Sequence, residues 1–325
     1  MSDYRILTAK ECAKELTKIK NPAILIHKNP DGDAVGSAAA LSEIFSQLGE
    51  AAVIACVDDV PERLSFILEK TGAVFSREIS GRTPITIDVA SPSQLSTLYT
   101  GLDRQIALMI DHHAVSTVFA DGYTDSEASS AAEALLDIAD ELIGENKISL
   151  TPSLAYAAYT AITSDTGCFC FSNASAKTYR RAAQLIDIGI DYADINHRLF
   201  HSKTDKQLKA EGFVATKIRT ACNGKVAYAS VCIKEREALS IPLAFFDSGI
   251  EIVRSMLGAE IAVLIKETAP GEYKVSMRST GKNVASIAAK FSGGGHIRAA
   301  GCTVMAADID LAQDMILKEI KNILD

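Results

Sequence analysis

Four short stretches in the first half of the chain carry carboxylate and imidazole side chains directly after apolar runs. In chain order, their polar residues are His27, Asp31 and Asp33; Asp88; Asp111, His112 and His113; and Asp165. Carboxylates gathered at one site raise each other's pKa, and a divalent cation removes that repulsion. Mixed imidazole and carboxylate ligands suit Mn²⁺ best, with Mg²⁺, Co²⁺ or Fe²⁺ as the other candidates. A pair of such ions would activate a bridging water and clamp a phosphoryl group, and we take Asp88 as the bridging carboxylate.

The secondary structure expected around these residues would bring them together. The predicted strands cover residues 21–28, 51–59, 85–91 and 106–113, and the predicted helices cover 8–20, 33–50, 61–72, 129–144 and 152–167. The strands lack polar alternation, as strands do when both of their faces are covered. We therefore predict an α/β fold with a doubly wound, mainly parallel sheet, in which ligands bind beyond the carboxyl ends of the strands.

Each of these residues also has a purely structural interpretation. Asp31 and Asp33 stand where aspartate caps a helix or closes a turn. His27 is compatible with a core histidine, and Asp165 with a turn at the end of a helix. A structural origin for all of them requires several independent coincidences, whereas one metal site at the edge of the sheet explains them together.

After residue 185 the alternation of predicted strands and helices gives way to a polar stretch, and this change predicts a second domain. Residues 186–212 are polar and compatible with a helix. We predict that they form a linker helix between a metal-binding catalytic domain at residues 1–185 and a smaller α+β domain at residues 213–325. Strands are expected in the smaller domain at 225–234, 260–267 and 273–279. A length of 325 residues agrees with two domains.

The second domain carries a glycine-rich sequence with basic neighbours. The stretch GGGHIRAAG at 293–301 would expose backbone amides. Arg278, Lys282, Lys290 and Arg298 make its surroundings basic in a chain of net charge −8. Such a loop would hold a phosphate group. The alternative is a flexible glycine loop beside a solvated basic face.

Bulk properties argue against several classes of protein. A net charge of −8 and the absence of Trp disfavour binding to long nucleic acids through many phosphate and stacking contacts. The first residues lack a signal-peptide core, and no apolar stretch is suited to span a bilayer. We therefore expect a cytoplasmic protein with no membrane partner. The seven cysteines have no zinc-finger spacing and are expected to be reduced.

Taken together, the motifs resemble those of the DHH phosphoesterases. HKNPDGDAVGS, ITIDVAS, MIDHH and ITSDTG occur in the order of that family's metal-binding motifs. RSTGKNVASIAAKFSGGGHIRAAG is similar to the phosphate-binding signature of its DHH-associated second domain. The resemblance covers essentially the whole chain, and the layout most resembles the bacterial nanoRNase/pAp-phosphatase branch. It implies two domains with the active site in the cleft between them.

The resemblance also implies a role for each residue. The ligands implied for one Mn²⁺ are His27, Asp31 and Asp88, and those implied for the other are Asp33, Asp88, His112 and Asp165. His113 would contact the scissile phosphate or act as general acid, and Asp111 would orient a histidine. The substrate-binding residues implied in the second domain are Arg278, Ser279, Asn283, Gly293, Gly294, Gly295 and His296.

The implied activity is hydrolysis of short oligoribonucleotides or of 3′-phosphoadenosine 5′-phosphate (pAp). Hydrolysis of cyclic di-AMP, or of its linear product pApA, is the nearest alternative. The alternative from another class is a non-catalytic nucleotide-binding regulatory module, although candidate ligands at every metal position argue against it. The glycine-rich domain argues against an inorganic pyrophosphatase, and the chain length against an exonuclease for long single strands. The oligomeric state stays open, with a homodimer as the candidate assembly.

Overall fold

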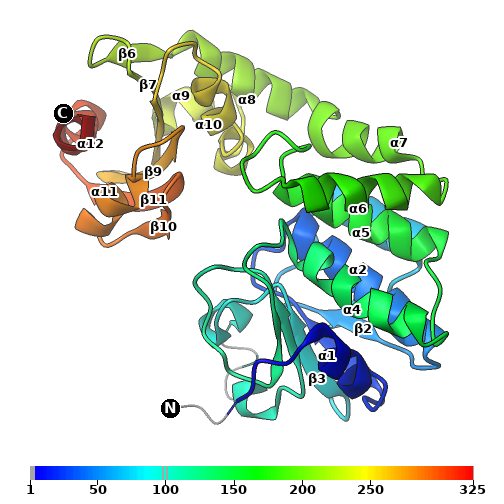
Figure 1. Ribbon diagram of the computed structural model, residues 1–325. Coiled ribbons are helices and arrows are strands. Elements are labelled where there is room, and N and C mark those ends of the chain that lie inside the picture. Colours follow the sequence, from blue (N-terminus) through cyan, green and yellow to red (C-terminus); the bar gives the residue numbers. More distant parts are fainter. Residues whose placement is uncertain (1–3, 97–98, 100–101, 325) are drawn as a thin grey trace. The chain divides into compact units, whose positions relative to one another are not determined.

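The computed structural model describes residues 4–96, 99 and 102–324 (Figure 1). The chain divides into two compact units, Met1–Ser202 and Lys203–Asp325. Each unit has its own sheet and its own hydrophobic core. No helix among the described residues is long and apolar enough to cross a membrane.

The division between the units falls inside the segment for which the sequence predicts one linker helix, residues 186–212. The structure has separate helical pieces there instead: α7 (Tyr192–Asn196), a π-helical turn η5 (His197–His201) and α8 (Asp205–Thr216). The helix is interrupted because Ser202 is extended. Thr204 then begins a new helix as the N-cap of α8, and Gln207 completes the capping box.

The sheet of the first unit is parallel throughout. Its strands are β1 (Pro22–Leu25), β2 (Val53–Ala55), β3 (Thr83–Ile87), β4 (Met109–Asp111) and β5 (Gly122–Thr124). Their order is β2-β1-β3-β4-β5, and every neighbouring pair is parallel. The chain runs outward from β1 to β2 and then returns to the other side of β1 as β3. This change of direction is the topological switch point at which open α/β sheets bind their ligands.

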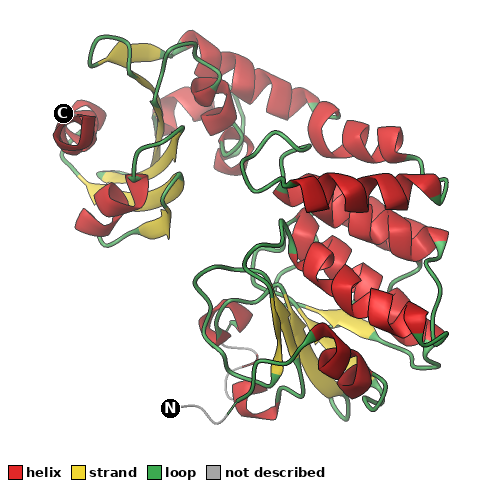
Figure 2. Cartoon of the chain, viewed as in Figure 1, coloured by secondary structure: helices red, strands yellow, loops and turns green. Residues whose placement is uncertain are grey.

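Helices cover one face of this sheet (Figure 2). They are α1 (Ala9–Leu16), α2 (Gly32–Gln47), α3 (Ser65–Thr71), α4 (Ala131–Gly144), α5 (Pro152–Asp165) and α6 (Ala176–Asp187). Ile24, Ile85 and Ile110 point from the strands into the same core as these helices. The opposite face carries Leu25 and Met109, which lie in one core with Leu95, Tyr99 and Phe119. Both faces are buried, as the apolar strands predict.

The contact between α2 and α5 is close because of one glycine. A Cβ added at Gly36 would lie 2.9 Å from the carbonyl oxygen of Ala157 and 2.9 Å from the amide nitrogen of Ala161. Only a residue without a side chain fits there, so the two helix backbones approach each other directly. Because α5 ends at Asp165 and α2 begins beside Asp31, this packing fixes both helix ends at the edge of the sheet.

The second unit is built on a mixed sheet of order β10-β11-β9-β8-β7-β6. The strands are β6 (Arg219–Ala221), β7 (Val226–Val231), β8 (Ile261–Ala269), β9 (Glu272–Ser279), β10 (Gly294–His296) and β11 (Ala299–Met305). The pair β7–β8 is parallel and the other pairs are antiparallel. Strands β7, β8 and β9 were expected from the sequence, whereas β6, β10 and β11 were not. This unit has the α+β character predicted for the second domain.

Helices pack on both faces of the second sheet. One core joins the sheet to α11 (Val284–Lys290) and α12 (Ile309–Leu324), and the other joins it to α8, the 3₁₀ turn η6 (Leu243–Phe246) and α10 (Gly249–Arg254). A short helix, α9 (Ile233–Ala238), follows β7. The regular alternation in β9, where Tyr273, Val275 and Met277 are buried, places its apolar side chains in the α11–α12 core.

Candidate active site

Asp88 lies at the centre of the candidate site. It follows the last residue of β3, and its backbone N–H donates to the carbonyl of Ile110 (3.0 Å). Its Oδ2 is 3.5 Å from Nε2 of His27, and its Oδ1 is 3.6 Å from Nε2 of His112. Asp88 has a φ of 60°, a left-handed conformation that costs a non-glycine residue about 1–3 kcal/mol and that clusters at functional sites. This backbone conformation lowers the stability of the fold, and it places the carboxylate of Asp88 between two imidazoles.

The first ligand group lies between β1 and α2. The Nδ1–H of His27 donates to the carbonyl of Lys28 (2.8 Å), which directs Nε2 toward Asp31 (3.8 Å) and Asp88. Asp31 is also the N-cap of α2, because its Oδ1 accepts from the amides of Asp33 (3.1 Å) and Ala34 (3.0 Å). One candidate ligand atom from each of His27, Asp31 and Asp88 lies within 4.8 Å of the others. The capping role is therefore real, and it does not remove Asp31 from the site.

A second group includes His112, which follows β4. Nε2 of His112 is 3.5 Å from Oδ2 of Asp33, and Asp165 completes the group from the last residue of α5. Asp33 is buried and is held by the hydroxyl of Ser37, which donates to its Oδ1 (2.6 Å). Candidate ligand atoms of Asp33, His112 and Asp165 also lie within 4.8 Å of one another.

His113 is held by the aspartate that precedes the two histidines. Its Nδ1 donates to Oδ1 of the fully buried Asp111 (2.7 Å) and lies 3.7 Å from Oδ1 of Asp88. The hydrogen-bond partner of Asp111 is therefore His113. The three polar residues that follow Ile110 therefore have different surroundings, although they are consecutive in the chain.

The surrounding carboxylates stabilise the charged forms of the histidines. Burial opposes the charge of His27, but attraction to Asp31 and Asp88 outweighs burial and raises its pKa to about 11. Burial likewise opposes the charge of His112, and attraction to Asp88 and Asp33 raises its pKa to about 10. Without a metal ion, both imidazoles are therefore protonated at neutral pH.

The pKa values of the buried carboxylates are shifted in two directions. Burial, with repulsion from Asp88, raises the pKa of Asp33 well above its usual value. Burial raises the pKa of Asp165 to about 6, and repulsion from Asp88 contributes to this rise. Asp88 is buried too, yet its pKa is lowered because His112 and His27 both stabilise its charged form. The carboxylates thus repel one another, and the imidazoles of His27 and His112 stabilise the charge of Asp88 in particular.

This donor set fits divalent cations. Asp31, Asp33, Asp88 and Asp165 make no ion pair with lysine or arginine within the described part of the first unit; their charged partners there are histidines. Carboxylate oxygens and imidazole nitrogens together are the ligands of Mn²⁺ and related ions. Asp88 belongs both to the group with His27 and Asp31 and to a further group with His112 and His113, so it is the carboxylate common to these two candidate groups.

Comparison with known families decides the assignment. Residues 22–162 match the model of the DHH family N-terminal domain, and residues 223–322 match the model of the DHHA1 domain. Together the two matches cover well over half of the chain. The chain belongs to the DHH family of phosphoesterases. The first match contains five of the six metal-ligand candidates, and Asp165 follows three residues after its end.

Several proteins resemble this DHH-family chain over nearly its whole length. The bifunctional oligoribonuclease and PAP phosphatase NrnA of Thermus thermophilus is 28% identical over 95% of this chain and 92% of that protein. NrnA of Bacillus subtilis is 27% identical over 92% of this chain and 94% of that protein. The crystal structure of an exopolyphosphatase-related protein from Bacteroides fragilis shares the fold, with a TM-score of 0.87 at 20% identity, and covers 97% of this chain and 95% of that one.

In the DHHA1 domain, the residues predicted to bind substrate gather around a hairpin. The sequence suggests a glycine loop at 293–301, but Gly294–His296 form the edge strand β10, which pairs with β11. The loop interpretation is wrong, because the glycines permit tight pairing of the two strands: a Cβ on Gly295 would lie 2.5 Å from the carbonyl oxygen of Ala299. The exposed hairpin adjoins the end of β9, since the amide of Ser279 donates to the carbonyl of Arg298 (2.9 Å).

The other predicted residues of this domain have local partners. The hydroxyl of Ser279 accepts from the amide of Lys282 (2.6 Å), and Asn283 is the N-cap of α11. Arg278 is partly neutralised, because its Nε donates to Oε1 of Glu251 (3.3 Å). Lys290 likewise pairs with Glu319. The basic character predicted from the sequence is therefore weaker in the folded domain than in the linear chain.

Sequence reasoning missed the residues that hold the ligands in place. The amide group of Asn173 donates to Oδ2 of Asp165 (3.1 Å), and the hydroxyl of Ser37 donates to Asp33. Neither residue carries a motif signal of its own.

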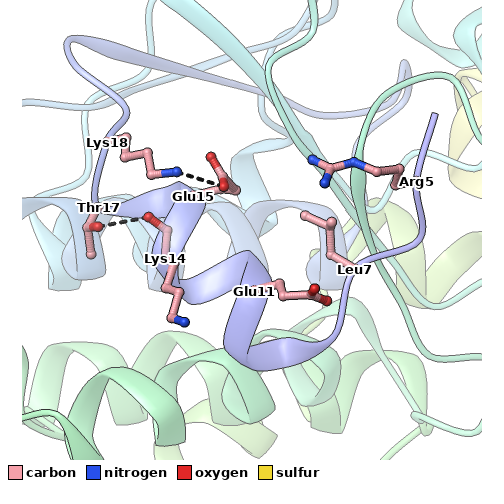
Figure 3. Close-up of a pocket in the computed structure, with 7 residues that line it drawn as sticks. All are labelled: Arg5, Leu7, Glu11, Lys14, Glu15, Thr17 and Lys18. Atoms are coloured by element: carbon pink, nitrogen blue, oxygen red, sulfur yellow. Dashed lines mark hydrogen bonds and ion pairs between the residues drawn. The ribbon is translucent and has the colours of Figure 1, made fainter. Parts of the chain in front are cut away.

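A cavity of about 310 Å³ beside α1 is lined by Arg5, Leu7, Glu11, Lys14, Glu15, Thr17 and Lys18 (Figure 3). None of the predicted site residues lines that cavity, where Lys18 pairs with Glu15 and Arg5 pairs with Asp121.

Proposed function

We propose that this phosphoesterase hydrolyses short oligoribonucleotides, pAp, or both, with two divalent metal ions. The observation that carries the proposal is the position of Asp88, which is buried between His27 and His112 and belongs to more than one possible ligand group. A carboxylate shared in this way suits a pair of ions. The names and the near-complete coverage of the relatives from Thermus thermophilus and Bacillus subtilis support the choice of substrate.

The proposed ligands fall into two sets that share one residue. The first set is His27, Asp31 and Asp88, and the second is Asp33, Asp88, His112 and Asp165. We propose Mn²⁺ as the native ion, with Mg²⁺ or Co²⁺ as alternatives. When bound, the ions would supply an activated water and stabilise charge on the phosphoryl oxygens.

The remaining residues would position the substrate and move protons. His113, oriented by Asp111, would contact the scissile phosphate or protonate the leaving oxygen. The DHHA1 residues Arg278, Ser279, Asn283, Gly293, Gly294, Gly295 and His296 would bind a terminal phosphate or base. A domain that grips one phosphate favours short substrates over long polymers. The net charge of −8 agrees with this preference, because long nucleic acids are bound through many basic contacts.

A substrate panel tests the proposal. The value of kcat/KM is measured with metal-free protein and with Mn²⁺-loaded protein for pAp, short RNA, pApA, cyclic di-AMP and pyrophosphate. We expect turnover only with metal, and the highest values for pAp or short RNA. A preference for cyclic di-AMP or pApA would favour the alternative phosphodiesterase. Binding of a nucleotide without any turnover would overturn the enzyme proposal in favour of a regulatory module.

Two variants show whether activity comes from this site. Asp88→Ala should abolish turnover and metal binding while circular dichroism remains that of the wild type. Asp59→Ala is the matched control, because Asp59 also follows a strand of the same sheet but is exposed and pairs with Arg77. Full activity in Asp88→Ala would exclude the bridging role.

A further inference from the structure

The segment at the start of α4, Ala128–Glu133, hydrogen-bonds directly to two members of one candidate ligand group and, through Asn173, to the third. The carbonyl of Ala128 accepts from Nδ1 of His112 (3.3 Å). The amide of Ala131 donates to Oδ2 of Asp33 (2.8 Å). The carbonyl of Ser129 accepts from Nδ2 of Asn173 (3.0 Å), and the same Nδ2 donates to Oδ2 of Asp165 (3.1 Å). One short segment therefore sets the positions of Asp33, His112 and Asp165.

The orientation of the Asn173 side chain follows from its partners. Nδ2 approaches the carbonyl of Ser129, the carbonyl of Asp165 (3.2 Å) and Oδ2 of Asp165. All three partners are acceptors, so the amide must present its NH₂ group to them. Asn173 thus joins the end of α5 to the beginning of α4. The carboxylate of Asp165 would otherwise be free to rotate at the last residue of its helix.

A buried carboxylate fixes the segment itself. Oε2 of Glu133 accepts from the amide (2.8 Å) and the hydroxyl (2.6 Å) of Ser129 and from the hydroxyl of Thr178 on α6 (3.0 Å). Glu133, Ser129 and Thr178 are fully buried. Oε1 of Glu133 accepts no hydrogen bond among the described residues, and a buried polar atom left in this way costs stability. A buried polar atom without a hydrogen bond lowers stability, and such exceptions are expected at residues that support a functional site.

We propose that Asn173 and Glu133 are positioning residues for one of the two metal subsites, the one formed by Asp33, His112 and Asp165. This inference rests on the proposed function, because it takes that group to be a metal subsite. The group formed by His27, Asp31 and Asp88 is held differently, through Lys28 and the start of α2. Loss of Asn173 should therefore weaken one subsite and leave the other intact.

Titration of metal-free protein with Mn²⁺ by calorimetry tests this inference without substrate. The wild type should show two binding events. In Asn173→Ala one event should weaken by about 10–100-fold, the usual effect of removing a group that orients a ligand, and the other should not change. Ser129→Ala, which removes one donor to Glu133, should shift the same event by a smaller factor.

Asn196→Ala is the matched control. Asn196 also makes two side-chain hydrogen bonds to α5, with Thr163 (3.1 Å) and Tyr159 (3.3 Å), but it touches no proposed ligand. The two Mn²⁺-binding events of Asn196→Ala should have the same affinities as those of the wild type. Equal weakening of both events in Asn173→Ala, unchanged binding there, or a single event in the wild type would overturn the inference. If the wild type binds Mn²⁺ twice but hydrolyses no substrate, the proposed function fails while the test of Asn173 still stands.

Discussion

Metal binding at the proposed site should expel protons, because two ligand histidines are charged before the metal arrives. The pKa of His27 is raised to about 11 and that of His112 to about 10, in each case by the facing carboxylates against the effect of burial. At pH 7 each imidazole must lose a proton before its nitrogen can bind a cation. We therefore expect saturation with Mn²⁺ at pH 7 to release about two protons per molecule.

The size of the pH effect follows from this count. Each released proton makes the apparent binding constant rise about tenfold per pH unit while the pH lies below the pKa. Two protons give a rise of about 100-fold between pH 7 and pH 8. The sign is positive because a raised histidine pKa means that protons compete with the metal up to about pH 10. Asp165, with a pKa of about 6, adds little in this range, whereas any proton on Asp33 would increase the count.

Calorimetry in buffers of equal pH and different ionisation enthalpy measures the protons released. The variant His112→Gln should reduce the release to about one proton, since His27 alone would remain. His201→Gln, at an exposed histidine outside the ligand groups, should leave the count unchanged. A heat of binding that does not depend on the buffer, or an affinity that does not change between pH 7 and pH 8, would refute the reasoning.

Three further predictions concern different parts of the chain. Asp111→Asn should move the basic limb of the kcat profile to lower pH without changing Mn²⁺ affinity, because the hydrogen bond to Asp111 raises the pKa of His113; an unmoved limb would rule out this role. Gly36→Val should lower the free energy of unfolding of the first unit by about 1–3 kcal/mol, measured in urea, whereas Gly144→Val, at a position with open space, should cost less than 1 kcal/mol. His296→Ala should raise KM for pAp more than it changes metal affinity, and an unchanged KM would argue against a substrate grip by the DHHA1 domain.

The metal-ligand candidates could be predicted because a parallel sheet converts sequence order into position. His27, Asp88 and His112 each follow an apolar strand, and β1, β3 and β4 are neighbours in the sheet. Carboxyl ends of parallel strands lie at one edge, so residues that follow them must meet there. The motif resemblance gave the same set, and the observed distances between these side chains agree with it.

The residues that orient the ligands could not be predicted in the same way. Asn173 reaches Asp165 only because the turn after α5 folds back, with left-handed backbone at Gly167, Cys168 and Phe169. No periodic pattern encodes such a turn. Ser129 and Glu133 look in the sequence like an ordinary helix start, and their link to the site depends on how α4 packs against α2 and α6. The β10–β11 hairpin was missed for a similar reason, since three glycines favour a loop interpretation.

Asp31 is both the N-cap of α2 and a member of a candidate ligand group. Its carboxylate caps α2 through the amides of Asp33 and Ala34, and those bonds also hold it toward His27. In an α/β fold the helix that follows a strand begins at the edge where ligands bind, so capping residues and ligands occupy the same places. The start of α4 is related to this arrangement, because its backbone amides donate to the carboxylate of Asp33, another candidate ligand. A capping pattern at a strand-to-helix junction is therefore an argument for examining a residue as a ligand, not for setting it aside.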